Sequence, residues 1–222
     1  MESRNNTLHY KTVTPLLLEI LRQLMLEPLF EPFVLVGGTN LSLRFGHRRS
    51  DDIDLFTDTA YDSIDFSLLE EYLYDHFAYF EKPDKSGIVG FGQGYYIGSS
   101  SDICVKLDLM YTDPFFSPID VIDGIRMASI EQIAAMKMHA IATGGRKKDW
   151  WDIYELLNIY NLEQLLDFHK KWQPWTFSEN DDIERLVDFS KANEQANPIS
   201  LNNTDWDDVR LRIIDAVRFL NV

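Results

Sequence analysis

Apolar residues near the start of the chain recur at the spacing of an amphipathic helix. Leucines lie three or four positions apart after Thr14-Pro15, where threonine is a favoured N-cap and proline suits the first helical position. A helix is therefore predicted to begin at Pro15 and to end near Pro28. The same spacing predicts helices over residues 39–45 and 65–80.

Short apolar stretches between these helices predict β-strands. They cover residues 33–36, 53–57, 88–91, 95–97 and 103–110. A glycine-bearing turn is expected to join the strands over residues 88–91 and 95–97. Strands and helices therefore mix through residues 1–125, which are predicted to form an α/β domain.

From Ser129 onward the apolar spacing is helical for nearly all of the remaining chain. Ser129-Ile-Glu-Gln132 has the sequence of a capping box, so a helix is predicted over residues 130–142. Further helices are expected over residues 147–160, 162–172, 181–191 and 205–220. The chain is thus predicted to be an α+β protein in which a helical domain, residues 126–222, follows the α/β domain.

The composition adds limits on class and location. Among 222 residues, 45% are hydrophobic and 26% are charged, as in an ordinary globular protein. No apolar run approaches the ~20 residues that span a bilayer, and the polar start of the chain lacks the apolar core of a signal peptide. Cys104 is the single cysteine, which excludes an intramolecular disulfide and makes a reducing cytoplasm the expected location.

The charge of the chain is unbalanced but locally patterned. A formal net charge of −15 argues against non-specific binding to duplex nucleic acid, which needs many cationic contacts to phosphates. Cations nevertheless gather in three short segments, as Arg44, Arg48, Arg49, Lys106, Lys137, Arg146, Lys147 and Lys148. In so acidic a chain they predict a local funnel for an anionic substrate, unless those in loops are simply solvated.

The most informative segment joins a glycine pair to an acidic pair. A predicted strand ends in Gly37-Gly38 and a short helix follows, so backbone amides there can approach and bind polyphosphate oxygens. Asp52 and Asp54 lie two apart in the next predicted strand, so both carboxylates project from one face.

Two carboxylates held this close repel each other, and a fold keeps such a pair when a cation lies between them. Asp108, in an otherwise apolar predicted strand and on the same face as Lys106, is a candidate third ligand. Oxygen ligands favour Mg²⁺ or Mn²⁺, and the sequence has no clustered His or Cys for zinc. Each feature alone is often a strand edge or a turn; their order and spacing together favour a metal site.

Two parts of the chain together resemble a known family. Gly37-Gly38, followed after thirteen residues by Asp52-Ile-Asp54-Leu-Phe, is similar to the signature of the polymerase-β-like nucleotidyltransferase superfamily. With the intervening Gly46-His-Arg, the string more narrowly resembles the AbiEii/AbiGii toxin family.

A second motif of that family appears on the helical side. Lys137 lies on a predicted helix and is followed by Arg146-Lys-Lys-Asp149-Trp-Trp-Asp152, so the resemblance covers about residues 33–157. Where the family often has an arginine directly before the matching aspartate, this chain has Lys148.

The resemblance implies a polymerase-β-like nucleotidyltransferase core with a mixed sheet, followed by a C-terminal helical bundle. It implies transfer of a nucleotide from a nucleoside triphosphate to an acceptor hydroxyl. In the characterised toxins the acceptor is RNA, typically a tRNA 3′ end, and a cognate antitoxin counteracts the toxin. No membrane partner is expected.

Residue roles follow from the motifs and the family together. The predicted ligands of two Mg²⁺ or Mn²⁺ ions are Asp52, Asp54 and Asp108. The residues expected to bind the nucleotide are Gly37, Gly38, Thr39, Arg48, Ser50 and Lys106. Lys137 and Asp149 join the catalytic set, because the residues that match them are essential to activity in the family; Asp149 is expected either to orient Lys137 or to bind the acceptor.

Two other functions remain open at this point. The acceptor can instead be a small molecule or a protein hydroxyl, which the net charge of −15 mildly favours over RNA. A non-catalytic nucleotide- or partner-binding module is the third reading, although the intact carboxylates make it less favoured.

Three minor features have competing structural interpretations. Gly90-x-Gly-x-Gly94 suggests a phosphate loop, but strands and turns explain it better. Trp150 and Trp151 are expected to pack in the helical half rather than to stack on a base. His47 either touches a phosphate or is satisfied locally.

Overall fold

The computed structural model describes residues 7–83 and 91–220, in which seven strands form one sheet. Its order is β3-β4-β5-β2-β1-β7-β6. The strands are β1 (Val34–Leu35), β2 (Asp52–Thr57), β3 (Tyr79–Glu81), β4 (Gly92–Ser100), β5 (Ile103–Tyr111), β6 (Asp120–Ile122) and β7 (Ile125–Met127). The β2–β5 and β1–β7 pairs are parallel and the other neighbours are antiparallel, so the predicted mixed sheet is confirmed.

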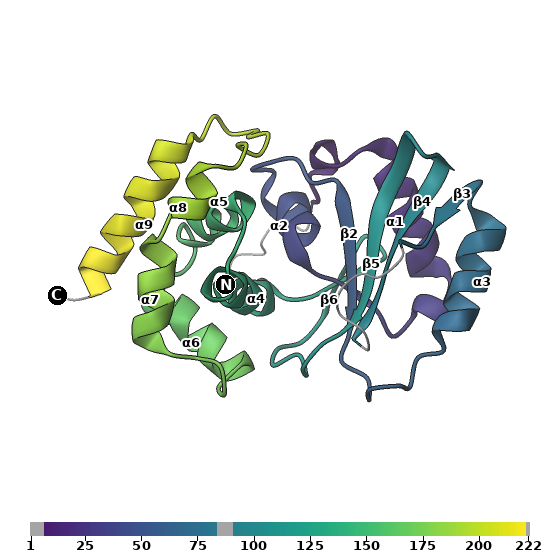
Figure 1. Ribbon diagram of the computed structural model, residues 1–222, viewed down its shortest axis with the longest axis horizontal. Helices are drawn as coiled ribbons and strands as arrows, with labels where there is room; N and C mark the ends of the chain where they lie inside the picture. Colours follow the sequence, from purple (N-terminus) through teal and green to yellow (C-terminus); the bar gives the residue numbers. More distant parts are fainter. Residues whose placement is uncertain (1–6, 84–90, 221–222) are drawn as a thin grey trace.

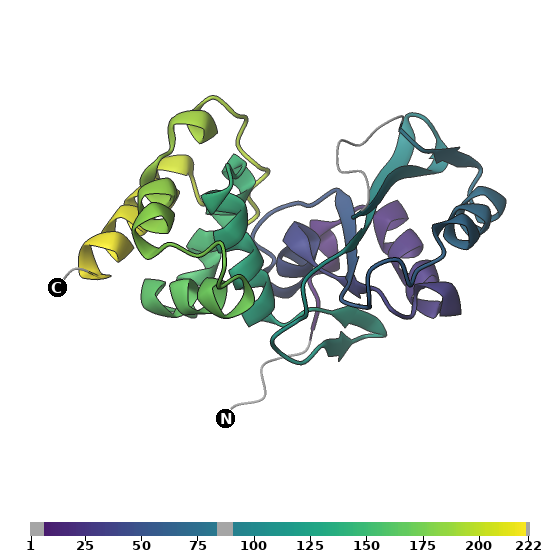
Figure 2. The same ribbon diagram turned by 60° about the horizontal axis from the view of Figure 1, so that its bottom comes forward.

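The helices fall into two groups (Figure 1). Beside the sheet lie α1 (Pro15–Leu26), α2 (Gly37–Phe45) and α3 (Phe66–His76). The second group is α4 (Ile130–Ala142), α5 (Lys147–Leu156), α6 (Leu162–Trp172), α7 (Glu179–Val187), α8 (Ser190–Asn193) and α9 (Trp206–Leu220). Figure 2 shows the second group on one side of the molecule and the sheet on the other.

Local signals placed several helix ends correctly. The Thr14 hydroxyl accepts the Leu17 N–H at 3.1 Å and caps α1. Ser129 likewise accepts the Gln132 N–H at 3.0 Å and opens α4. Only this half of the predicted capping box forms, because the Gln132 side chain accepts the Phe116 N–H instead.

The predicted helix over residues 65–80 is too long. It ends at His76, and Tyr79–Glu81 forms β3, which pairs with β4. The reason is tertiary: β4 offers hydrogen-bond partners to this backbone, and these outweigh the helical spacing of its side chains. The helix predicted over residues 147–160 similarly ends at Leu156, and that predicted over 181–191 divides into α7 and α8.

The predicted turn between residues 91 and 95 is wrong, and residues 88–90 of the preceding strand lie outside the described residues. β4 runs without a turn from Gly92 to Ser100. A Cβ on Gly92 would lie 2.1 Å from the Leu109 carbonyl oxygen, and one on Gly94 would lie 2.8 Å from Asp108 Oδ1. These two glycines therefore mark close approach to β5 rather than a chain reversal.

Two hydrophobic cores form, and α2 contributes to both. Leu43 packs with α1 and the sheet in the first, whereas Leu41 packs with α4 and α5 in the second. α2 is therefore packed against both the sheet and the helical group, and its first turn lies between them. In residues 7–83 and 91–220, none of the helices is long and apolar enough to cross a bilayer.

Candidate active site

A cavity of about 520 Å³ lies between the sheet and the helical group. From the sheet side come residues of the β1–α2 junction, of β2 and of the loop before β2, including Gly37, Gly38, Ser50, Asp52 and Asp54. From the helical side come residues of α4, α5 and the loop between them, including Lys137, Arg146, Lys148 and Asp149. The two sequence motifs, which lie far apart along the chain, therefore line the same cavity.

Neither glycine of the pair could carry a side chain without displacing a close neighbour. Gly37 has φ +69°, and a Cβ on it would lie 2.2 Å from Asp54 Oδ2. A Cβ on Gly38 would lie 2.2 Å from Nη2 of Arg48. The glycines thus make room for two side chains of the protein, and they place the start of α2 on the cavity, where its amides can meet an anion.

The carboxylates of Asp52, Asp54 and Asp108 lie close together on the sheet, and neighbouring cations do not fully balance their negative charge. Asp54 lies directly opposite Asp108 in the parallel pair β2–β5, and Asp52 lies opposite Lys106. Burial and the charges of Asp108 and Asp52 raise the pKa of Asp54 to about 6. Among the described residues the cavity wall includes Asp52 and Asp54 but not Asp108.

Two lysines bind these carboxylates. Lys148 Nζ donates to Asp52 Oδ2 at 3.1 Å, and Lys106 Nζ forms an ion pair with Asp108. Within the described part of the chain, no three His, Cys, Asp or Glu side chains are grouped so that they hold a metal ion by themselves. The donor set and the raised pKa of Asp54 nevertheless suit a hard divalent cation whose remaining ligands come from a bound polyphosphate.

A second acidic cluster, on α5, is fully compensated. Asp152 is completely buried and accepts from Arg48 Nε at 2.7 Å and Nη2 at 2.8 Å. It also lies 2.6 Å from Lys137 Nζ and 2.9 Å from His47 Nε2. Although burial raises the pKa of Asp152, the charges of Arg48 and Lys137 outweigh it and hold the pKa well below its usual range.

Asp149 completes that cluster. Its Oδ1 accepts from Lys137 Nζ at 2.7 Å and its Oδ2 accepts the Arg146 N–H at 2.9 Å, at the start of α5. The predicted contact between Asp149 and Lys137 is therefore present, and Asp149 also lies in the first turn of α5, where a negative charge complements the helix dipole.

Sequence reasoning missed Asp152, although the motif contained it. The available signal was its position three residues after Asp149 on one helix, in a stretch of tryptophan and isoleucine that is buried.

Two residues predicted to bind the nucleotide have other partners. The guanidinium of Arg48 is buried, donates from Nε and Nη2 to Asp152 and from Nη1 to the Arg49 carbonyl oxygen, and so is not free to reach a phosphate. The Thr39 hydroxyl is buried and donates to the Asp52 carbonyl oxygen at 2.5 Å, beside the Ser50 hydroxyl. Both side chains fix the backbone around the cavity instead.

The predicted cationic funnel is smaller than expected. Lys147 is buried and donates to the Gln195 carbonyl oxygen at 2.6 Å, and Arg44 forms an ion pair with Asp120 at 2.8 Å. Lys137, Arg146 and Lys148 are the cations of that predicted group that line the cavity.

The minor features have structural roles. Trp150 Nε1 donates to the Leu186 carbonyl oxygen at 2.8 Å, and Trp151 stacks on Trp206 with ring centroids 5.9 Å apart. The packing interpretation of the two tryptophans is therefore confirmed. His47 Nε2 lies 2.9 Å from Asp152 Oδ1, whereas its buried Nδ1 has no hydrogen-bond partner.

Comparison with known proteins agrees with this geometry. Residues 19–216 match the family described as "Nucleotidyl transferase AbiEii toxin, Type IV TA system". An uncharacterized protein of Aquifex aeolicus (strain VF5) is 31% identical over an alignment of 176 residues, and the match covers 73% of this chain and 76% of that protein.

Two solved structures share the fold. MenT4, a nucleotidyltransferase toxin from Mycobacterium tuberculosis H37Rv, superposes with a TM-score of 0.60 at 14% identity, over 92% of this chain and 83% of that one. JHP933 from Helicobacter pylori gives 0.58 at 20% identity, over 96% and 93%.

Proposed function

The chain belongs to the AbiEii nucleotidyltransferase toxin family of type IV toxin–antitoxin systems, and on that premise we propose that it transfers a nucleotide to RNA. The proposed donor is a nucleoside triphosphate with Mg²⁺ or Mn²⁺, and the proposed acceptor is an RNA hydroxyl such as a tRNA 3′ end. A cognate antitoxin is the expected protein partner.

One observation carries this proposal. The start of α2, the two carboxylates of β2 and the Lys137–Asp149 pair line one cavity, although they come from opposite halves of the molecule. A polyphosphate bound there would meet backbone amides at one end and three cations, Lys137, Arg146 and Lys148, on the facing wall.

Nucleotidyl transfer needs little covalent chemistry from the protein, which acts by positioning and by neutralising charge. Asp52, Asp54 and Asp108 would hold the divalent ions, which neutralise the triphosphate and the leaving pyrophosphate when bound. The amides at Gly37 and Gly38 would orient the β- and γ-phosphates, with Ser50 beside them.

Lys137 has a different task from the other cations. It is held between Asp149 and Asp152 on a rigid helix, so its ammonium group keeps one position at the cavity wall. We assign it stabilisation of charge on the transferred phosphate, because a preorganised cation needs no reorganisation during the reaction. Lys148 can leave Asp52 to meet a phosphate, since its pair is partly exposed.

The test is label transfer. The protein is incubated with each of the four α-labelled nucleoside triphosphates, Mg²⁺ and total RNA. Label should enter RNA with the wild type and not with Asp54→Asn. Asp75→Asn, an exposed aspartate on α3, should behave as the wild type. Absence of label with all four nucleotides, or equal labelling by Asp54→Asn, contradicts the proposal.

The acceptor class needs a separate measurement. If RNA is the acceptor, its apparent affinity should fall steeply as salt rises, because phosphate contacts release counterions. A weak salt dependence, with label on a small molecule or on protein, would favour the alternative acceptors instead.

A further inference from the structure

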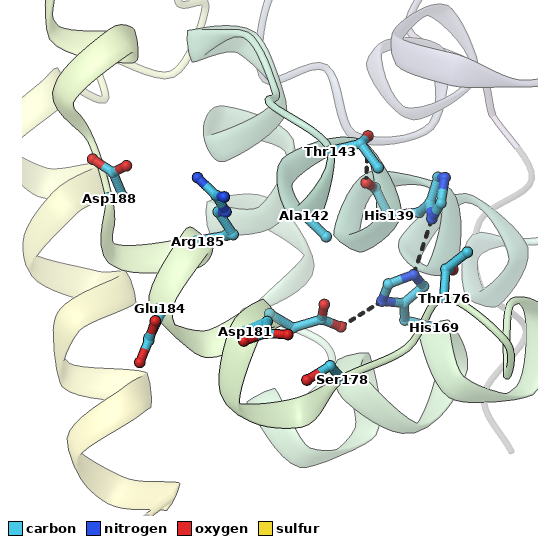
Figure 3. Close-up of a pocket in the computed structure, with 11 residues that line it drawn as sticks. His139, Ala142, Thr143, His169, Thr176, Ser178, Asp181, Glu184, Arg185 and Asp188 are labelled. Carbon is cyan, nitrogen blue, oxygen red and sulfur yellow. Dashed lines mark hydrogen bonds and ion pairs between the residues drawn. The ribbon is translucent and has the colours of Figure 1, made fainter.

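A second cavity, of about 550 Å³, adjoins the candidate active site. It lies among α4, α6 and α7 (Figure 3). The two cavities share His139 and Thr143, which therefore stand between them. No motif had singled out either residue.

His139 is the end of a chain of three titratable side chains. Its Nδ1 lies 3.1 Å from His169 Nε2, and His169 Nδ1 lies 2.6 Å from Asp182 Oδ2. His169 is fully buried and Asp182 is 3% exposed, although both line the second cavity. Each member comes from a different helix, α4, α6 or α7.

With His169 neutral, the hydrogen bonds determine which nitrogen of His139 is unprotonated. A carboxylate only accepts, so Asp182 requires the proton of His169 on Nδ1. Nε2 of His169 is then an acceptor, and it requires the proton of His139 on Nδ1. The lone pair of His139 is thereby directed to its Nε2.

That nitrogen is available for chemistry. Figure 3 shows the second ring nitrogen of His139 pointing away from His169. The ring is held edge-on by Trp172, with centroids 5.7 Å apart, and Trp172 also lines the candidate active site. Burial lowers the pKa of His139, which favours its neutral form.

We propose that His139 Nε2 accepts the proton of the acceptor hydroxyl during nucleotidyl transfer, with His169 and Asp182 as positioning residues. This inference rests on the proposed function. The hydroxyl oxygen bonds to the α-phosphorus, its proton passes to His139 Nε2, and the bond from the α-phosphorus to the bridging oxygen breaks to release pyrophosphate. The arrangement follows the logic of a base oriented by a second group.

The competing role is structural: the hydrogen-bonded row of His139, His169 and Asp182 would only hold three helices together. Apolar side chains would hold the helices together with a smaller desolvation penalty, since a buried row of polar side chains brings no stability unless every polar atom has a partner. This row of side chains instead ends on His139, which lines the candidate active site.

The test uses a variant that separates the two roles. His139→Asn keeps a hydrogen-bond donor near the position of Nδ1, and so the contact to His169, but it removes Nε2. His139→Ala opens space in the cavity wall for added imidazole. His76→Ala, an exposed histidine on α3, is the control. Each is assayed by label transfer from the α-labelled nucleotide to total RNA.

Both His139 variants should lose about 10²- to 10⁴-fold in kcat, with KM for the nucleotide changed by less than about threefold. Imidazole should restore part of the activity of His139→Ala and none to His139→Asn. His76→Ala should match the wild type.

The failures are distinguishable. A wild type inactive with every nucleotide overturns the proposed function and this inference together. Full activity in His139→Asn overturns this inference alone. A loss in His139→Ala without imidazole rescue, with His139→Asn still active, assigns the chain to structure and also overturns it.

Discussion

The two acidic clusters that face each other across the cavity differ in their balance of charge. On the sheet, Asp54 has a raised pKa, and Asp52 is bound by a single partly exposed lysine. On α5, Asp152 is completely buried, yet its pKa is lowered, because Arg48 and Lys137 compensate it. The buried, balanced cluster therefore acts as a scaffold, whereas the unbalanced cluster is suited to a cation brought by the substrate.

The strongest test removes one acid from each cluster. Asp152→Ala should cost about 3–5 kcal/mol of unfolding free energy, because it leaves Arg48 and Lys137 buried without their partner. Asp52→Ala should cost less than about 1 kcal/mol, since its ion pair is partly exposed. Urea unfolding without metal measures both, and equal losses would remove the distinction between the clusters.

Acid should weaken the balanced cluster in a defined pH window. The pKa of Asp152 is lowered in the folded state relative to about 3.9 in the unfolded chain. Its contribution is therefore fully present above about pH 4 and is lost as the pH falls towards the folded pKa. Asp152→Asn should show a smaller acid-induced loss of stability than the wild type in unfolding experiments below about pH 4. If the stability of both proteins falls equally as the pH is lowered, Asp152 does not make this contribution.

Gly38 lies against Arg48, whose charge compensates Asp152. Gly38→Ala should destabilise the protein by about 1–3 kcal/mol, because the added Cβ displaces the Arg48 guanidinium from Asp152. The loss should not add to that of Arg48→Ala, since the clash needs the guanidinium. A double-mutant cycle measured by thermal unfolding tests this; additive losses would argue that Gly38 is needed for another reason.

For Asp54, in the unbalanced cluster, removal of the negative charge is expected to raise the stability of the protein rather than lower it. Without metal, Asp54→Asn should raise stability by about 1 kcal/mol, or roughly 2–4 °C in Tm, because it removes like-charge repulsion. With Mg²⁺ and nucleoside triphosphate the wild type should gain further stability and the variant should not. Calorimetric Tm shifts of equal size in both proteins would mean that Asp54 is no ligand.

The smallest effect on stability is expected for the exposed pair. Lys148→Met should change the unfolding free energy by less than about 0.5 kcal/mol, because the Lys148–Asp52 pair is partly solvated. If Lys148 leaves Asp52 to bind phosphate, KM for the nucleotide should still rise. Unchanged kinetics with unchanged stability would make the pair an incidental surface contact.

The sequence alone determined what depends on neighbours a few residues away. The start of α1 at Pro15 and the bounds of α4 and α6 follow from caps and apolar spacing, which act within one or two turns. The shared face of Asp52 and Asp54 follows from the two-residue period of a strand. The spacing of the glycine and acidic motifs also indicated the family correctly.

Only the tertiary structure decided which charges meet. Arg48 and Asp152 are separated by 104 positions, and no local pattern connects them, so the sequence predicts Arg48 as a phosphate ligand rather than as the partner of Asp152. Residues 79–81 became a strand, and Gly92 and Gly94 lie within β4, because a partner strand supplied hydrogen bonds and close packing. Local propensities are worth less than ~1 kcal/mol per residue, whereas an unpaired buried charge costs several, so long-range pairing decides at this cavity.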